Sequence, residues 1–252
     1  MPRWTSCNVL QAAPDANRVW QFHARGDFRL NREVRAANGR ALPAKFVGKS
    51  WSSLWQPTLN VAWLPLESVF LRVLELPKST WEETVSMVEL QLEKLSPLPV
   101  TQIVWTLHLL EQASAENLQT AVVLIAERKV VEEFLGKLEA SGFLADRLEA
   151  PMLDQLEAAH TTEDGAWIYP LPFGGQNAAL VAWWVGRSLR NLSFVILPPA
   201  GDRAASLKGQ LTQLIWAGEM EGWLAAAPRW HLVADPVNAH EWETLLREGL
   251  GE

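Results

Sequence analysis

The most informative segment of the chain reads Phe70-Leu-Arg-Val-Leu-Glu-Leu-Pro77. It is rich in strand-forming apolar residues, and it ends at a proline, which cannot donate a hydrogen bond to a neighbouring strand. The segment therefore predicts a β-strand of about seven residues, which is an ordinary strand length.

A capping signal follows this strand. Ser79 and Thr80 each precede a glutamate by three residues, which is the spacing of a capping box at the start of a helix. Apolar residues then recur at helical spacing up to two prolines, at positions 97 and 99, that end the pattern. The stretch predicts one helix from Ser79 to Leu95, with an apolar stripe made of Trp81, Val85, Val88, Leu92 and Leu95.

The chain from Thr101 to Gly142 continues with further strand and helix patterns. Apolar runs predict strands over Thr101–Leu110 and Thr120–Ala126, and a helical pattern covers Arg128–Ser141. Gly142 stands where a left-handed residue is expected after a helix. The predicted order is strand, helix, strand, strand, helix.

Four of these segments, in this order and spacing, resemble the PilM family of type IV pilus assembly and the related GspL cytoplasmic domain of type II secretion. The resemblance covers roughly residues 60–160. Its segments are Phe70-Leu-Arg-Val-Leu-Glu-Leu-Pro77, Glu89-Leu-Gln-Leu-Glu93, Pro97-Leu-Pro99, and Ala126-Glu-Arg-Lys-Val-Val-Glu-Glu-Phe-Leu135 followed by Ala140-Ser-Gly142.

The resemblance implies an α/β, actin-like (ribonuclease H-like) fold of two lobes. Residues 1–160 would form the first lobe, with the inserted strand-helix-strand-strand-helix subdomain at about 66–142. Residues 164–252 would form a reduced second lobe, after a polar, turn-forming boundary at Thr161-Thr-Glu-Asp-Gly165.

The nucleotide motifs of actin-like ATPases are missing from the sequence. These proteins hold phosphates with two Asp-x-Gly turns, whose amides and magnesium-binding carboxylate neutralise the charge. No such turn follows the N-terminal strands, and Trp184-Val185-Gly186 stands where the second is expected. No glycine pair occurs in Trp230-His-Leu-Val-Ala-Asp235. We therefore expect no nucleotide, metal or other cofactor.

Composition narrows the function further. A net charge of −7 argues against nucleic acid, whose binding depends on neutralising phosphates. The single cysteine excludes an internal disulfide, and no apolar run approaches the roughly 20 residues that span a bilayer. No P-loop, zinc-protease or serine-hydrolase motif occurs, and the five histidines lack metal-ligand spacing. The sequence predicts a cytoplasmic protein, and the resemblance implies that it reaches the inner membrane through partners.

The remaining elements are predicted from short apolar runs and helical patterns. A hairpin is expected from residues 18–23 and 28–34 around Gly26-Asp27, and a strand over Asn60–Leu64. In the second half we expect four strands, at 166–169, 178–185, 189–197 and 231–233. Two helices are expected there, at 204–224 and 239–250.

Fourteen tryptophans accompany a single tyrosine. Trp183 and Trp184 are neighbours on a predicted strand, so they point to opposite faces. Both can be buried only if both faces of that sheet are covered. For any one tryptophan, core packing is favoured over a docking role.

Positive charge is concentrated between Arg25 and Lys49, where the sequence has seven basic residues and two acidic ones. The hairpin arginines could contact anionic lipid or an acidic partner, although a solvated surface is the favoured interpretation. These arginines are Arg25, Arg29, Arg32 and Arg35.

Two functions remain open at this point. The first is a non-catalytic scaffold of a type IV pilus or type II secretion assembly platform. The resemblance implies that it binds the cytoplasmic tail of a single-span, PilN-like membrane protein, and it leaves open a secretion or pilus ATPase as a further partner. The second is an actin-like kinase or ATPase with a rearranged site. The expected rim of the partner groove is Leu95, Pro97, Leu98 and Pro99; homodimer formation is left open.

Overall fold

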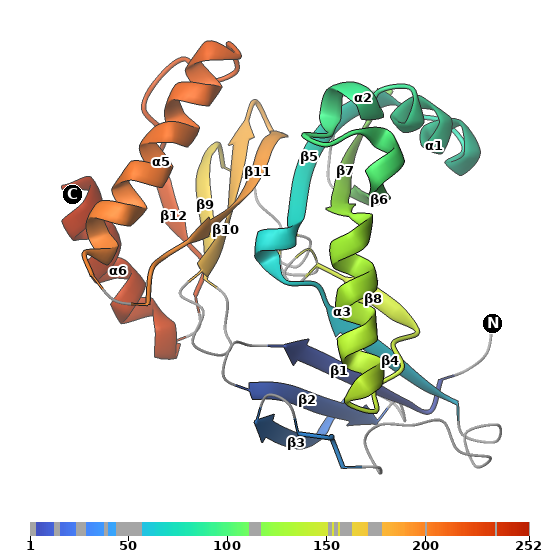
Figure 1. Cartoon of the computed structure of the whole chain (residues 1–252). Coiled ribbons are helices and arrows are strands. Elements are labelled where there is room, and N and C mark those ends of the chain that lie inside the picture. Colours follow the sequence, from blue (N-terminus) through green and yellow to red (C-terminus); the bar gives the residue numbers. More distant parts are fainter. Residues whose placement is uncertain are drawn as a thin grey trace. The chain divides into compact units, whose positions relative to one another are not determined.

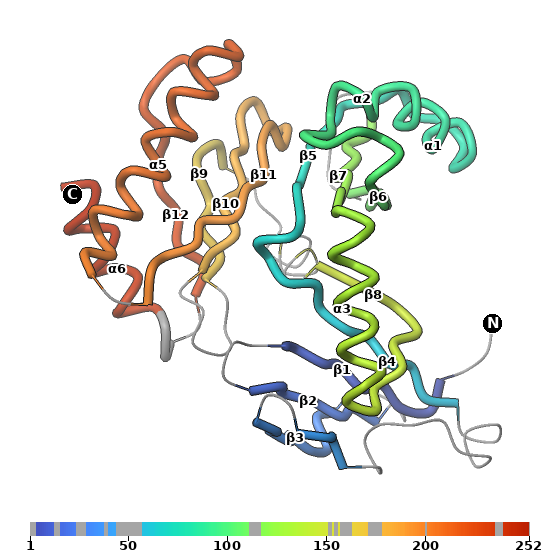
Figure 2. Tube along the Cα trace, viewed as in Figure 1, coloured from blue at the N-terminus to red at the C-terminus, as the bar shows by residue number. Residues whose placement is uncertain are grey.

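The computed structural model describes residues 4–12, 16–23, 29–37, 40–43, 57–110, 117–150, 153, 156, 163–170, 178–199, 201–234 and 236–251. The chain divides into two compact units. The first comprises residues 1–69, 102–104 and 126–151, and the second comprises residues 70–101, 105–125 and 152–252. Figure 1 shows the elements of both units, and Figure 2 traces the path of the chain through them.

The first unit contains a five-stranded sheet, called here the first sheet, in the order β3-β2-β1-β4-β8. Strands β1, β2 and β3 are antiparallel neighbours, whereas β4 runs parallel to both β1 and β8. Apolar side chains of α3 pack on its central strands, so this helix covers one face. The bounds are β1 Ser6–Ala12, β2 Ala16–His23, β3 Arg29–Ala37, β4 Thr58–Trp63, β8 Arg147–Glu149 and α3 Arg128–Ala140.

Helix α3 ends as the sequence predicts. Gly142 has a φ of +89°, the left-handed conformation expected after a helix. Its amide donates to the Glu139 carbonyl, and the Phe143 amide donates to the Leu138 carbonyl. These two bonds form a Schellman motif, which turns Phe143 back into the core beside Leu138.

The face of the first sheet on which α3 packs also carries, at one end, a ladder of hydrogen-bonded polar side chains. The Asn8 amide nitrogen donates to the Asn60 side-chain oxygen at 2.9 Å, and the Ser6 and Thr58 hydroxyls lie 2.8 Å apart. Asn60 also donates through its side chain to the Leu144 carbonyl at 3.0 Å. These bonds join β1, β4 and the segment before β8, and they give hydrogen-bond partners to the buried side chains of Ser6, Asn8 and Asn60.

The second unit contains a three-stranded sheet, the inserted sheet, in the order β5-β7-β6. Gln119 on β7 donates to the Thr84 hydroxyl of α1 at 2.8 Å, and Arg72 on β5 donates to the Leu95 carbonyl of α2 at 2.9 Å. Both helices are thereby tied to the sheet. The bounds are β5 Val69–Pro77, β6 Ile103–Leu110, β7 Leu118–Glu127, α1 Trp81–Glu89 and α2 Leu92–Leu95, with short 3₁₀ turns at Leu66–Ser68 and Val100–Gln102.

The prediction of one continuous helix from Ser79 to Leu95 is wrong. The predicted capping box is present at Thr80 and Glu83, but the helix breaks at Leu90 and Gln91. There the Gln91 and Lys94 amides bond three residues back instead of four, which tightens the chain into a 3₁₀-like turn. The apolar spacing continues across this break, which is why the pattern alone did not reveal it.

The second unit also contains a four-stranded sheet, the second sheet, in the order β11-β10-β9-β12. Strands β9, β10 and β11 are antiparallel neighbours, and β12 runs parallel to β9. Helices α5 and α6 pack on one of its faces and supply part of the core there. The bounds are β9 Gly165–Pro170, β10 Ala178–Val185, β11 Ser188–Ile196, β12 Trp230–Leu232, α5 Arg203–Met220 and α6 Pro236–Leu250.

A cluster of tryptophan rings fills the core at one end of the second sheet. Trp183 is fully buried, and its ring lies edge-on to Trp223 at 5.8 Å and to Trp230 at 5.6 Å. Gly218 makes room for this cluster, because a Cβ there would lie 2.6 Å from the Trp223 ring. Trp184 is also buried, at 5% exposure, so both faces of β10 are covered.

Helix α5 is shorter than predicted, because it ends at Met220 instead of continuing to 224. Gly222 has a φ of +77°, and its amide bonds to Glu219 while the Trp223 amide bonds to Gly218. This is a second Schellman ending, for which Gly222 was the signal in the sequence.

The side chain of Gln210 in α5 reaches the end of the edge strand β11. It accepts from the Ile196 amide at 3.2 Å and donates to the Ile196 carbonyl at 2.9 Å.

Among the described residues, none of the helices combines the length and the hydropathy that crossing a bilayer requires.

Candidate functional site

The turn between β10 and β11 holds the residues that the sequence analysis compared with an Asp-x-Gly motif. Gly186 and Arg187 both have positive φ, at 61° and 65°, as in the two-residue primed turns of β-hairpins. Trp184-Val185-Gly186 is therefore the approach to a tight hairpin turn, in which Arg187 takes the second left-handed position.

The amides of this turn point at a carboxylate of the chain itself. Asp164, the residue before β9, accepts from the Gly186 amide at 2.8 Å and from the Arg187 amide at 3.0 Å. Successive amides in such a turn can bind an anion. Here Asp164 is that anion, and these amide bonds hold the pKa of its carboxyl below the usual value.

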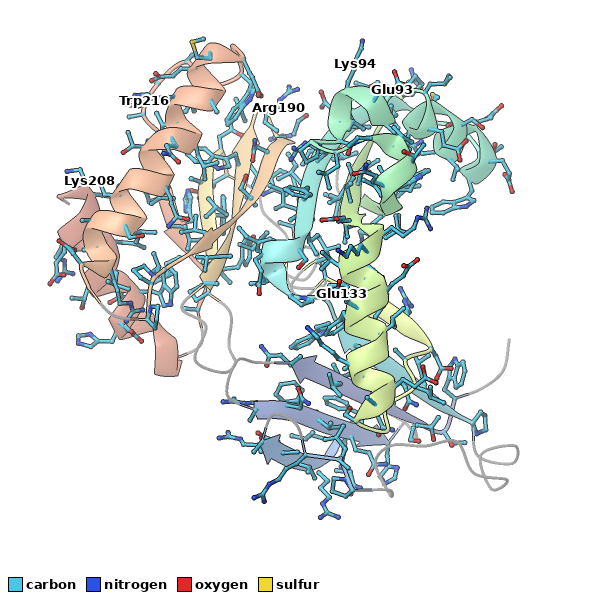
Figure 3. The ribbon with its side chains drawn as sticks, viewed as in Figure 1. Glu93, Lys94, Glu133, Arg190, Lys208 and Trp216 are labelled. Atoms are coloured by element: carbon cyan, nitrogen blue, oxygen red, sulfur yellow. The ribbon has the colours of Figure 1, made fainter. Side chains whose placement is uncertain are left out.

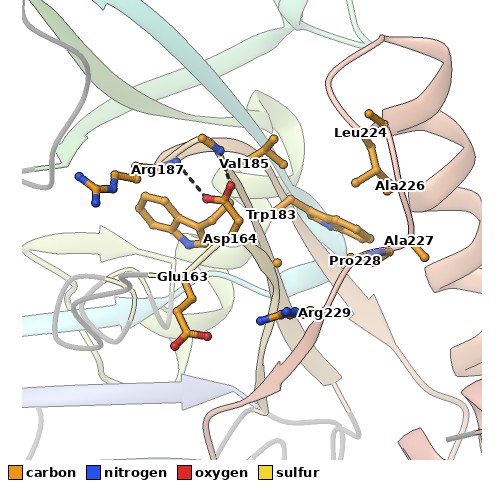
Figure 4. A pocket seen from close by; sticks show the side chains of 14 residues that line it. Glu163, Asp164, Trp183, Val185, Arg187, Leu224, Ala226, Ala227, Pro228 and Arg229 are labelled. Carbon is orange, nitrogen blue, oxygen red and sulfur yellow. Dashed lines mark hydrogen bonds between the residues drawn. The ribbon is translucent and has the colours of Figure 1, made fainter.

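A cavity of about 890 Å³ lies at this end of the second sheet. Figure 4 shows it between the β10–β11 turn, the start of β9 and the segment after α5. Trp183 and Trp184 contribute to its lining, and their indole nitrogens are buried with no hydrogen-bond partner in the described part of the chain. Half of the remaining lining is apolar, and the other half includes the charged residues Glu163, Asp164, Arg187 and Arg229. The apolar residues are Val185, Leu224, Ala225, Ala226, Ala227 and Pro228.

The cavity offers little acid–base chemistry. A general base works best with a pKa near the working pH, whereas the shift at Asp164 goes the other way. Both Asp164 oxygens already accept backbone hydrogen bonds. Within the described residues, moreover, no group of three His, Cys, Asp or Glu side chains is arranged to hold a metal ion.

A second hollow, of about 530 Å³, lies beside helix α1 in the inserted subdomain. Pro77 and Met87 supply apolar surface, while Glu82 and Glu83 supply carboxylates. Glu83 is used in the capping box with Thr80, where the backbone and hydroxyl hydrogen bonds lower its pKa. Glu82 is exposed and has no partner among the described residues, so its charge is available to a ligand.

The α1–α2 segment is acidic beyond this hollow. Glu82 and Glu89 lie seven residues apart on α1, which places them on one side of the helix, and Glu93 follows at the start of α2. Leu90, at the break between the helices, is 87% exposed. Figure 3 shows Glu93 and Lys94 at the outer surface of α2. This hollow is not predicted by the sequence pattern.

The predicted groove rim directly follows α2. Pro97 and Pro99 are exposed, while Leu95 and Leu98 are half-buried. The Ser96 hydroxyl donates to the Leu98 carbonyl at 2.7 Å and accepts from the Leu98 amide at 3.0 Å, which fixes the turn between the prolines. These four residues form one continuous surface segment, whose role in partner binding stays a prediction.

Three of the four predicted basic residues lie on the edge strand β3. Arg29, Arg32 and Arg35 are exposed, and Arg35 pairs with Glu33 at 3.0 Å. Arg25 and the Gly26-Asp27 turn lie outside the described residues, as do Thr161 and Thr162 of the predicted boundary. The strands of the predicted hairpin are present and pair in antiparallel fashion. Lipid or acidic-partner contact by these arginines stays a prediction.

No protein-family model matches the chain, and no curated protein matches it at a significant level. Solved structures do match. A chain of the PilM–PilN type IV pilus biogenesis complex is similar with a TM-score of 0.65 and 16% identity, over 99% of this chain and 87% of that one. This chain has an actin-like fold.

Two further structures agree. The cytoplasmic domain of EpsL, an inner membrane component of the type II secretion system of Vibrio cholerae, matches with a TM-score of 0.50 and 17% identity, over 98% of this chain and 95% of that one. A Bacteroides thetaiotaomicron protein with an actin-like ATPase fold and unknown function matches with a TM-score of 0.50 and 8% identity, over 98% and 89%. The predicted fold class and the resemblance to PilM and GspL are confirmed at the level of the fold.

Proposed function

We propose that the protein is a non-catalytic scaffold of a type IV pilus or type II secretion assembly platform, placed in the cytoplasm and held at the inner membrane by a partner. The observation that carries the proposal is the match along 99% of the chain to a structure described as the PilM–PilN complex. The match to the EpsL cytoplasmic domain, over 98% of the chain, supports the same class of machine.

The state of the β10–β11 turn supports a role other than catalysis. A turn that binds phosphate must offer free amides, and the Gly186 and Arg187 amides are both bonded to Asp164. Phosphate there would compete with a carboxylate attached to the same chain. The alternative function, an actin-like kinase or ATPase, predicts MgATP binding elsewhere in the molecule.

The partner we propose is the cytoplasmic tail of a single-span membrane protein. Cytoplasmic segments close to a membrane span carry an excess of lysine and arginine. The hollow beside α1 suits such a side chain, because its aliphatic stem can lie on Pro77 and Met87 while its charge approaches Glu82. The tail would continue past Glu89 and Glu93 toward the predicted rim at Leu95–Pro99.

Fluorescence anisotropy with synthetic tail peptides tests this proposal. The peptides are the cytoplasmic tails of single-span inner-membrane assembly proteins from the same genome. We expect one of them to bind, with an affinity that falls as salt is added, because exposed charge pairs are screened. If none of the tails binds at low salt, the scaffold proposal is wrong.

Variants then locate the site. Glu82→Lys should weaken the bound peptide at least about tenfold if a basic residue occupies the hollow, since an attractive contact becomes repulsive. Leu95→Asp and Leu98→Asp test the predicted rim. Glu133→Gln is the matched control, because Glu133 is an exposed glutamate of α3 whose side-chain partner is Lys129. Binding that survives all three site variants would place the partner elsewhere.

Calorimetric titration with MgATP separates the two functions. The scaffold proposal expects no heat of binding from the purified chain. Saturable binding of MgATP would favour the enzyme alternative, whatever the peptide experiments show.

A further inference from the structure

The outer side of α5 exposes two large apolar side chains. Trp216 is 62% exposed and Met220 is 88% exposed, and they lie one turn apart on the helix. The opposite side of α5 is in the core, where Leu207 and Leu211 are fully buried. Figure 3 shows Trp216 and Lys208 projecting from α5 away from the second sheet. Exposed large apolar side chains grouped in this way often mark an interaction surface.

The N-terminal half of the same stripe is made of small residues. Ala205, Gly209 and Thr212 share the spacing of three and four residues that leads to Trp216 and Met220. A Cβ added at Gly209 would have nothing within 4 Å. Glycine is disfavoured inside a helix, and the packing of this chain gives it no purpose at this position. It leaves a notch in an exposed surface.

The stripe on α5 is complementary to the same stripe of a second copy when the two helices run antiparallel. In an antiparallel pair of α5 helices centred between Gln213 and Leu214, Trp216 comes to lie between Gly209 and Thr212 of the partner subunit. Met220 likewise lies between Ala205 and Gly209 of the partner subunit. Large side chains facing small ones allow two helices to interdigitate, whereas a parallel pair would place Trp216 against the partner's Trp216.

The charges agree with the same pairing. Lys208 and Glu219 lie on the same flank of the stripe, and neither makes an ion pair within the described part of the chain. The antiparallel pair brings Lys208 opposite Glu219 of the partner subunit, twice by symmetry. A two-fold interface requires this kind of self-complementary patch. We propose that the protein forms a symmetric dimer through antiparallel α5 helices.

The expected dimer is weak, because α5 is 18 residues long and a helix of that length extends only about 27 Å. Interfaces built from so small a patch belong to the transient class. Dimerisation does not depend on the proposed scaffold function, since it involves a different surface of the chain.

Sedimentation velocity of the purified full chain over a concentration series tests the proposal. The wild-type chain should show a reversible monomer–dimer equilibrium. Trp216→Ala should weaken the dimer at least tenfold, and Gly209→Leu should do the same by filling the notch, while far-UV circular dichroism shows that both remain folded. Trp81→Ala is the matched control, because Trp81 is 53% exposed on α1, and it should leave the equilibrium unchanged. A wild-type chain that stays monomeric at all concentrations would overturn the proposal.

Charge reversal tests the antiparallel geometry directly. Lys208→Glu and Glu219→Lys should each weaken self-association severalfold, because each creates two like-charge contacts. An equimolar mixture of the two variants should recover the dimer, as should the double variant, because opposite charges then meet again. Dimers that form equally well in either single variant, or that the mixture fails to recover, would rule out this interface. If the protein bound lipid vesicles saturably through Trp216 and formed no dimer, the proposed dimer would also be overturned.

Discussion

The first and second sheets hold their central strands together by different means. In the first sheet β1 and β4 are joined by the buried Asn8–Asn60 bond, which continues into the Leu144 carbonyl. In the second sheet β10 is held by the packing of large apolar side chains, since the Trp183 ring packs against Trp223 and Trp230.

The difference concerns what each arrangement specifies. A one-residue slip of β4 would turn Asn60 to the other face and leave buried polar groups without partners, so the ladder selects one register. The tryptophan cluster contributes more buried area, but apolar packing accepts other shapes of similar volume. The first sheet is therefore specified by polar geometry and the second by filling of its core. Four predictions test this contrast.

Trp183→Ala should have the largest effect. Removing a fully buried aromatic side chain typically costs about 3–5 kcal/mol in the free energy of unfolding, through lost burial and the cavity that remains. Urea denaturation followed by circular dichroism measures the loss. Trp81→Ala, at an exposed position, should change the free energy by less than about 0.5 kcal/mol. Equal costs for the two variants would refute a core built on tryptophan volume.

Asn60→Ala should come second, at about 2–3 kcal/mol, because it leaves the buried Asn8 amide without this bond and removes the side-chain donor to the Leu144 carbonyl. A double-mutant cycle with Asn8→Ala sharpens the comparison. The two variants share one bond, so the double variant should cost less than the sum of the single ones. Strict additivity would show that the two side chains do not act as a pair.

Asp164→Ala should cost about 1 kcal/mol at neutral pH, since it removes the acceptor for two exposed turn amides. The pKa of this carboxyl is lower in the folded chain than its ordinary value of 3.8. Its stabilising effect is therefore complete above that value and is lost as the pH falls below 3.8 through the folded pKa. Denaturation curves of wild type and variant should converge in acid; a constant difference would contradict the assigned role.

Cys7 on β1 should give the smallest effect. Burial, and then the nearby charge of Glu149, raise the pKa of its thiol from its ordinary value of 9.0 to about 11. Because the thiolate is the reactive form, alkylation at neutral pH should be slow in the folded chain and fast in urea. A raised pKa also means that the thiol's contribution to stability is complete below pH 9.0 and is lost as the pH rises toward 11. Rapid labelling of native protein would contradict this burial.

Much of the secondary structure could be predicted from the sequence, because it depends on local signals. The run from Ala178 to Val185 is a strand with the predicted bounds, and Gly142 ends α3 as expected. The break between α1 and α2 could not be predicted in this way, since the apolar spacing runs through it. The end of α5 was misplaced because apolar residues continue beyond Gly222.

The candidate site was less accessible to sequence reasoning. Asp164 and the turn it binds are about 22 residues apart in sequence, and their contact depends on the register of β9 and β10. The hollow beside α1 depends on the backbone path after Pro77. Such features arise from pairing and packing, which a linear pattern does not encode, although the Asp-Gly pair at 164–165 marked a turn.

The amide of Gln210 has a consequence for how the protein behaves in a crowded cell. An open strand edge is a template on which another extended chain can add, and this is a common route to aggregation. At Ile196 the Gln210 side chain offers the same donor and acceptor that an incoming strand would bring. The Gln210 side chain thus occupies the hydrogen-bonding groups of Ile196 at the end of the edge strand β11. An added strand cannot pair with those groups at this position.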